Sequence, residues 1–176
     1  MVTPTFKRPR YAKALATKAF GDRSMGEWFE QSTYGMQASD KFITSTQVLA
    51  LNTTAIEVVP APGAGKYLMF MGAVVFLDYG GTAYVDEAGE DLVFTYTDKS
   101  GAEISHTLDG DMFDGTADVF AFAYPLNAAA SVLAAAANAP ICLFLKSGNW
   151  ATGNSPIKVR TFYRVIDTTD MANISA

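Results

Sequence analysis

Three short segments of the sequence contain residue types that could bind a ligand or a metal ion. In the first, Pro60–Tyr67, two glycines precede Lys66, as in a phosphate-binding loop. That loop requires a glycine five residues before its final glycine and a serine or threonine directly after the lysine. Pro60 and Tyr67 occupy these two positions, so the segment instead predicts a turn between strands.

The second segment, Asp109–Gly115, spaces its carboxylates like a calcium loop. An EF-hand needs an oxygen ligand at the fifth position and a glutamate at the twelfth, where this chain has Phe113 and Phe120. The pattern therefore favours a solvated acidic turn, as it does for the third segment, Asp86–Asp91. It leaves open a weak calcium site with four ligands: Asp109, Asp111, Asp114 and Asp118.

His106 and Cys142 are the only histidine and the only cysteine. A catalytic triad could be built only on His106, which lies in a predicted polar hairpin, and no nucleophile elbow accompanies it. A single cysteine excludes an internal disulfide and a cysteine-based zinc site, and Cys142 lies in an apolar run predicted to be buried. The sequence thus predicts a protein that is not an enzyme and uses no cofactor.

Eight short segments that could hold these residues in place alternate with turn signals such as Pro60–Gly63 and Asp98–Gly101. We expect Gly72 to bend or bulge its strand. The spacing is typical of an all-β antiparallel sandwich or jelly roll. Ala128–Ala137 fits a helix or a strand and turn equally well. The predicted strands are residues 43–51, 55–59, 66–77, 91–97, 103–108, 119–124, 141–146 and 157–166.

Residues 1–40 differ from the predicted domain, residues 41–168, and from a short tail at 169–176. Pro4 and Pro9 favour an extended N-terminal arm, with one short helix expected at Tyr11–Phe20. Trp28 and Phe29 either fold back onto their own domain or anchor the arm on another protein, because tryptophan is favoured at interfaces.

The net charge of −5 is unevenly distributed. Residues 1–20 hold five basic and no acidic side chains, whereas residues 21–176 hold 8 basic and 18 acidic ones. An acidic body disfavours nucleic acid, and the basic arm suits either phosphate or an acidic protein surface. No apolar run approaches the roughly 20 residues of a membrane helix. The basic start is not followed by the apolar region of a signal peptide, so we expect the protein to be made inside a cell.

Two stretches of the chain resemble a group of small tailed-bacteriophage structural proteins. They are ITSTQVLALNTTAIEVVPAPGAGKYLMFMGAVVFLDYGGTAY and NAPICLFLKSGNWATGNSPIKVRTFYRVID. The likeness covers Ile43–Asp167, the predicted domain without its arm. Some phage decoration (cement) proteins, which sit on the capsid as trimers, have β-sandwich or jelly-roll bodies of the kind expected here.

The resemblance implies a decoration protein on the capsid surface of a virion, assembled in the host cytoplasm. Its partners would be the major capsid protein and itself, as a homotrimer, with no membrane and no nucleic acid. In that role Lys7, Arg8, Arg10 and Lys13 would pair with capsid carboxylates, and Trp28 and Phe29 would anchor the arm. Two alternatives remain: a tail, baseplate or receptor-binding component with the same body, and a hydrolase or lectin-like sugar binder.

Overall fold

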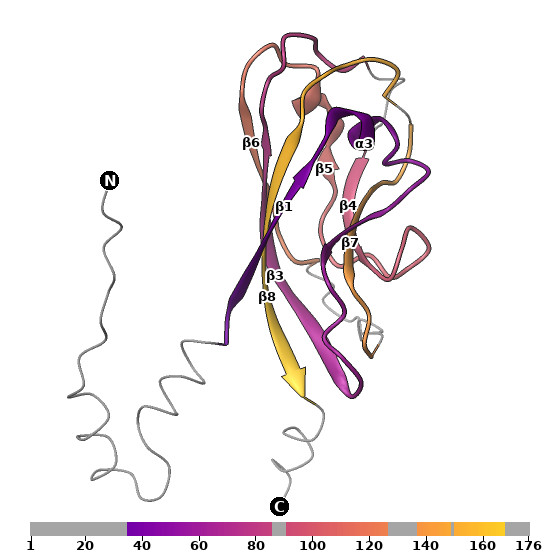
Figure 1. The fold of residues 1–176 in the computed structure, drawn as a ribbon, viewed down its shortest axis with the longest axis vertical. Helices are drawn as coiled ribbons and strands as arrows, with labels where there is room; N and C mark the ends of the chain where they lie inside the picture. Colours follow the sequence, from indigo (N-terminus) through magenta and orange to yellow (C-terminus); the bar gives the residue numbers. More distant parts are fainter. Residues whose placement is uncertain (1–34, 86–90, 127–136, 149, 168–176) are drawn as a thin grey trace, which may run out of the picture. The chain divides into compact units, whose positions relative to one another are not determined.

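A computed structural model of the chain describes residues 35–85, 91–126, 137–148 and 150–167. The description concerns the unit Gln37–Ala176 and the two residues before it. In that unit eight strands form two four-stranded antiparallel sheets that pack face to face (Figure 1). The predicted all-β sandwich is confirmed.

The first sheet has the strand order β1-β8-β3-β6. Its strands are β1 (Gln37–Ile43), β8 (Ile157–Asp167), β3 (Lys66–Leu77) and β6 (Val119–Ala123). The two longest strands, β3 and β8, lie at its centre and pair along nearly their whole lengths. Strands β1 and β6 form its two edges.

The second sheet has the order β2-β7-β4-β5. Its strands are β2 (Ile56–Val59), β7 (Ile141–Leu145), β4 (Asp91–Tyr96) and β5 (Leu108–Asp109). All five residues of β7 are buried, in keeping with its uninterrupted apolar sequence at the middle of the sheet.

The hydrophobic core lies between the two sheets. Phe70 of β3 meets Phe94 of β4 with 5.2 Å between ring centroids. The Tyr96 hydroxyl donates a hydrogen bond to the Leu68 carbonyl, which ties β4 to β3. At one end of the core, the Trp150 ring packs on Phe113 and Tyr84, with centroid distances of 4.4 and 5.5 Å. The two sheets therefore hold each other rigidly through large, fully buried side chains.

Gly72 bulges β3, as the sequence predicts. The register of β3 against β8 shifts between Phe70 and Gly72, and Gly72 has a φ of +141°. A Cβ atom built there would lie 3.2 Å from the carbonyl oxygen of Ala123 on β6. Glycine is required here both for this backbone conformation and for the close approach of β6.

The prediction of a strand over residues 43–51 is wrong. Ser45–Leu49 form a short helix, α3, that begins with a capping box. The Thr44 hydroxyl accepts a hydrogen bond from the Gln47 amide at 3.3 Å, and the Gln47 side chain accepts from the Thr44 amide at 3.0 Å. This reciprocal pair satisfies amides that a helix start leaves without partners, which outweighs the β-branched composition.

Two further boundaries differ from the predicted ones. Strand β1 begins at Gln37, inside the segment predicted to be an extended arm, because its residues pair with β8 from Gln37 to Ile43. Residues 103–108 form two isolated bridges, Glu103 with Thr95 and Ser105 with Pro125, and only Leu108 joins a strand. The Ser105 hydroxyl accepts the Phe94 amide at 3.0 Å, so a side chain replaces a backbone partner at this point.

Candidate protein-interaction surface

The outer side of the first sheet carries exposed aromatic side chains in register. Along one row of paired residues, Phe42 of β1 faces Lys158 of β8, which faces Phe76 of β3, which faces Phe120 of β6. The adjacent row runs through four residues in the same strand order. These are Asp40, Arg160, Val74 and Phe122. Both rows point away from the core, because their inward neighbours such as Val75 and Val159 are buried.

These aromatic side chains are unusually open to solvent. Phe42, Phe120 and Phe122 are 55, 63 and 55% exposed. A groove of about 740 Å³ runs between Phe42 and Phe120 over β1, β8, β3 and β6. We call this surface the aromatic face. It consists of Phe42, Val74, Phe76, Phe120, Phe122 and Phe162, and its charged residues are Asp40, Lys41, Lys158 and Arg160.

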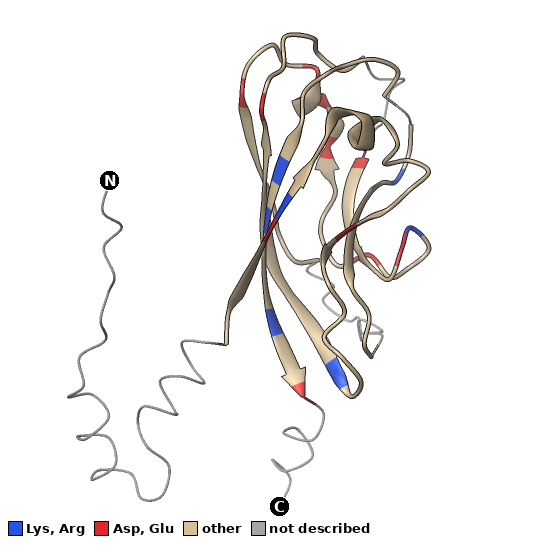
Figure 2. Cartoon of the chain, viewed as in Figure 1, with Lys and Arg blue, Asp and Glu red and all other residues tan. Residues whose placement is uncertain are grey.

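Two cations of the aromatic face make ion pairs, Arg160 with a carboxylate of the face and Lys158 with Asp78 beside it. Arg160 reaches Asp40 across the β8–β1 pair with two hydrogen bonds, Nε to Oδ1 at 2.6 Å and Nη2 to Oδ2 at 2.7 Å. The hydrogen bond from Arg160 lowers the pKa of Asp40 below its usual 3.8, and Asp40 in turn raises the pKa of Arg160. The blue segments along β8 in Figure 2 mark basic residues of this strand.

Lys158 makes the second ion pair and an aromatic contact. Its Nζ lies 2.7 Å from Oδ2 of Asp78, just beyond β3, and 5.4 Å from the centroid of the Phe76 ring. Phe76 also packs on Phe120, with 4.5 Å between ring centroids. A cation over an aromatic ring is attracted by the negative face of the ring. The apolar and charged side chains thus hold each other in place.

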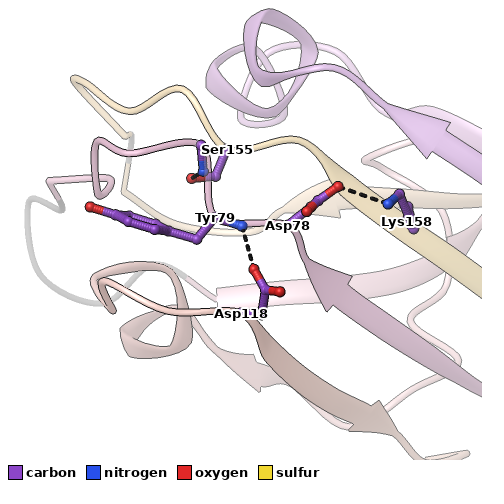
Figure 3. A network of polar contacts seen from close by, with 6 residues as sticks. Asp78, Tyr79, Asp118, Ser155 and Lys158 are labelled. Carbon is purple, nitrogen blue, oxygen red and sulfur yellow. Dashed lines mark hydrogen bonds and ion pairs between the residues drawn. The ribbon is translucent and has the colours of Figure 1, made fainter.

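Hydrogen bonds from backbone amides to side chains fix the end of the aromatic face at Asp78 (Figure 3). The Tyr79 amide donates to Oδ1 of Asp118 at 2.9 Å, and the Gly80 amide donates to the Ser155 hydroxyl at 3.0 Å. These bonds join the end of β3 to the loop before β6 and to the loop before β8. They hold Asp78 where it can reach Lys158.

The residues singled out from the sequence lie elsewhere. Lys7, Arg8, Arg10, Lys13, Trp28 and Phe29 lie outside the described residues, as does Ala128–Ala137 apart from its last residue. Cys142 is buried in β7, and its Sγ lies 3.2 Å from the Thr97 carbonyl. Burial is the main cause that raises the pKa of this thiol to about 11, with smaller effects from Glu57 and Asp98. The thiol is therefore mostly protonated at neutral pH, and a reactive role does not fit it.

The acidic segment after β5 forms a 3₁₀ turn, η1 (Gly110–Phe113). The Asp109 side chain caps it by accepting the Asp111 amide at 3.2 Å. The Asp118 carboxylate accepts the Tyr79 amide, as described above. Among the described residues, no group of three or more histidine, cysteine, aspartate or glutamate side chains is placed to hold a metal ion.

His106 lies in an exposed segment where its backbone amide donates to the Tyr124 carbonyl at 3.0 Å. Within the part of the chain that the structure describes, no helix is long and apolar enough to cross a membrane.

The aromatic face was not predicted from the sequence, although one signal of it is present. The segment Val119–Tyr124, VFAFAY, places aromatic side chains at every second position and carries no charge. Large residues alternating with alanine indicate that one side of the strand is aromatic, without telling which side faces the core.

No protein-family model matches the sequence, and no curated protein does. Solved structures with a distant likeness are bacteriophage capsids. A chain of the cyanophage Pam1 capsid asymmetric unit is 15% identical, with 73% of this chain and 84% of that chain covered and a TM-score of 0.45. A chain of the capsid of Ralstonia phage GP4 is 16% identical, with 73% of this chain and 82% of that chain covered and a TM-score of 0.37. A chain of the acid-stable capsid structure of Helicobacter pylori bacteriophage KHP30 is 15% identical, with 74% of this chain and 96% of that chain covered and a TM-score of 0.29.

Proposed function

We propose that this chain is a structural protein of a bacteriophage virion, and within the virion a decoration protein that binds the major capsid protein as a homotrimer. The observation that carries the proposal is the aromatic face, a rigid sheet surface on which three phenylalanines are more than half exposed. Isolated soluble proteins rarely expose contiguous apolar surface of this kind, and where they do it marks an interaction site.

The fold supports the same proposal from a second side. Every described strand belongs to one of two sheets that pack on a common hydrophobic core, and this packing makes the body rigid. A protein that bridges shell subunits must resist deformation while it adds buried area between them. The sequence resemblance to tailed-phage structural proteins covers this same body.

The proposal assigns attachment to the N-terminal arm. Its basic residues Lys7, Arg8, Arg10 and Lys13 would pair with carboxylates of the shell, and Trp28 and Phe29 would bury aromatic surface there. A segment that becomes ordered on binding can cover a large surface, although the lost conformational entropy offsets part of the gain.

The arm is tested by charge reversal in the full-length chain. We expect Lys7→Glu with Lys13→Glu to weaken co-sedimentation with emptied capsids of the parent phage by about tenfold or more, since each lost charge pair contributes on the order of 1 kcal/mol. The control is Lys66→Glu with Lys99→Glu, the same change in net charge at the start of β3 and in the β4 hairpin.

Equal weakening by both pairs would show that net charge, rather than the arm, governs attachment. Unchanged binding by the arm variant would remove the arm from the proposal. Binding of the wild-type chain to phage tails, and not to capsids, would favour the tail, baseplate or receptor-binding alternative.

A further inference from the structure

We propose that the aromatic face is covered by a second copy of this chain. The inference rests on the proposed function and deepens it, because it names the surface through which the proposed oligomer forms. Three properties of the face carry it: its exposed area, its internal charge balance and the character of its edge strand.

The exposed phenylalanines supply about a third of the area that a standard contact between copies needs. A fully covered aromatic side chain buries roughly 150–250 Å². At 55, 63 and 55% exposure, Phe42, Phe120 and Phe122 leave on the order of 300 Å² uncovered in each copy. A standard interface buries about 800 Å² per partner. The groove between Phe42 and Phe120, lined also by Val74, Phe76 and Phe162, adds further apolar area.

The charge balance of the face suits contact with an identical surface. The whole chain has a net charge of −5, so two copies repel each other over most orientations. On the aromatic face, however, Arg160 is paired with Asp40 and Lys158 with Asp78. Neither Arg160 nor Lys158 therefore needs a partner of opposite charge, and copies of the face can meet around a symmetry axis with both ion pairs intact.

The edge strand of the face lacks the charged residues that usually protect such a strand against association, although residues 104–106 pair with the chain at its C-terminal end. Among the described strands, β6 pairs only with β3. Exposed edge strands usually carry lysine, an inward charge or a bulge that prevents contact with another chain. The six residues Val119–Tyr124 contain no charged residue, and Tyr124 at their end is 65% exposed. We therefore infer that this edge strand is covered by another copy in the assembled protein.

The test measures self-association of the full-length chain by analytical ultracentrifugation over a wide range of protein concentration. We expect the wild type to form a defined oligomer. Phe122→Glu, on β6, and Phe42→Glu, on the opposite edge at β1, should each raise the dissociation constant by about tenfold or more, as substitutions at the centre of an interface do. The control is Val85→Glu, at a residue that is 57% exposed and lies outside the face.

Circular dichroism identifies any variant that fails to fold, and two variants on separate strands keep the test decisive. A wild type that stays monomeric at every concentration, or face variants that associate as tightly as Val85→Glu, would overturn the inference. Capsid binding by the same wild-type sample is measured in parallel. A monomer that binds capsids would support the decoration role and reject self-association, so the face would contact another protein. An oligomer that binds no capsid would support self-association through the face and reject the decoration role.

Discussion

Arg160 and Asp40 show how single residues shape the aromatic face. Their two hydrogen bonds of 2.6 and 2.7 Å join the central strand β8 to the edge strand β1 in the middle of an apolar surface. An isolated surface ion pair contributes little to folding stability. The pair orients the guanidinium of Arg160 and keeps Arg160 and Asp40 paired when the face is covered.

This pairing predicts a measurable titration. The folded-state pKa of Asp40 is depressed, so the contribution of the pair to stability is present above the ordinary pKa of 3.8 and is lost as the pH falls through the lower folded-state pKa. NMR titration of the Asp40 carboxyl should give a pKa below 3.8, and Arg160→Gln should return it towards that value. Lys158→Gln, which removes the cation of the neighbouring pair, should leave it unchanged; equal responses to both variants would contradict the assignment.

At the scale of secondary-structure elements, the bulge in β3 sets the relation between β3 and its two neighbours. Gly72 allows the register shift against β8 and the close approach of the Ala123 carbonyl on β6. Beyond the bulge, Val74 and Phe76 point outward and align with Phe122 and Phe120. The alignment of β3 and β6 on the aromatic face therefore depends on the glycine at position 72.

The bulge predicts unequal effects of two glycine substitutions. Gly72→Ala should lower the free energy of unfolding by about 1–3 kcal/mol, because alanine strains a backbone at φ +141° and its Cβ crowds the Ala123 oxygen. Gly115→Ala should change it by less than about 0.5 kcal/mol, since its Cβ would have only ordinary contacts, the nearest at 3.7 Å. Urea denaturation measures both, and similar losses at the two sites would argue against the strained bulge.

Strand β6 shows what sequence patterns could and could not predict. The alternation in Val119–Tyr124 correctly predicts the strand, but general hydrophobicity would place the phenylalanines inward. The structure places Ala123 in the core and Phe120 and Phe122 outside, where Phe120 packs on Phe76 and Phe122 lies in register with Val74. Which side of a strand faces the core is set by such contacts between distant segments, and a local pattern does not contain them.

The helix α3 illustrates the opposite case, in which a local signal was present. Thr44 and Gln47 have the spacing of a capping box, which favours a helix start independently of tertiary contacts. The β-branched residues around them pointed towards a strand. The long strands β3 and β8 were predicted well because their apolar and alternating residues extend over ten residues or more.

The whole molecule combines a rigid body with an uneven distribution of charge. The N-terminal twenty residues are basic and the remainder is acidic. Such a chain suits two separate contacts: an electrostatic one made by the arm and an apolar one made by the aromatic face. In the proposed decoration protein the first joins the chain to the shell, and the second joins copies of the chain to each other.

The most direct test of this account is cryo-electron microscopy of the parent virion, with the two-sheet body fitted into the map. We predict density for this body in symmetric clusters on the outer surface of the shell, with the β1-β8-β3-β6 sheet of each copy turned towards its neighbours. Density confined to the tail or baseplate, or a body on the shell whose aromatic face is open to solvent, would contradict it.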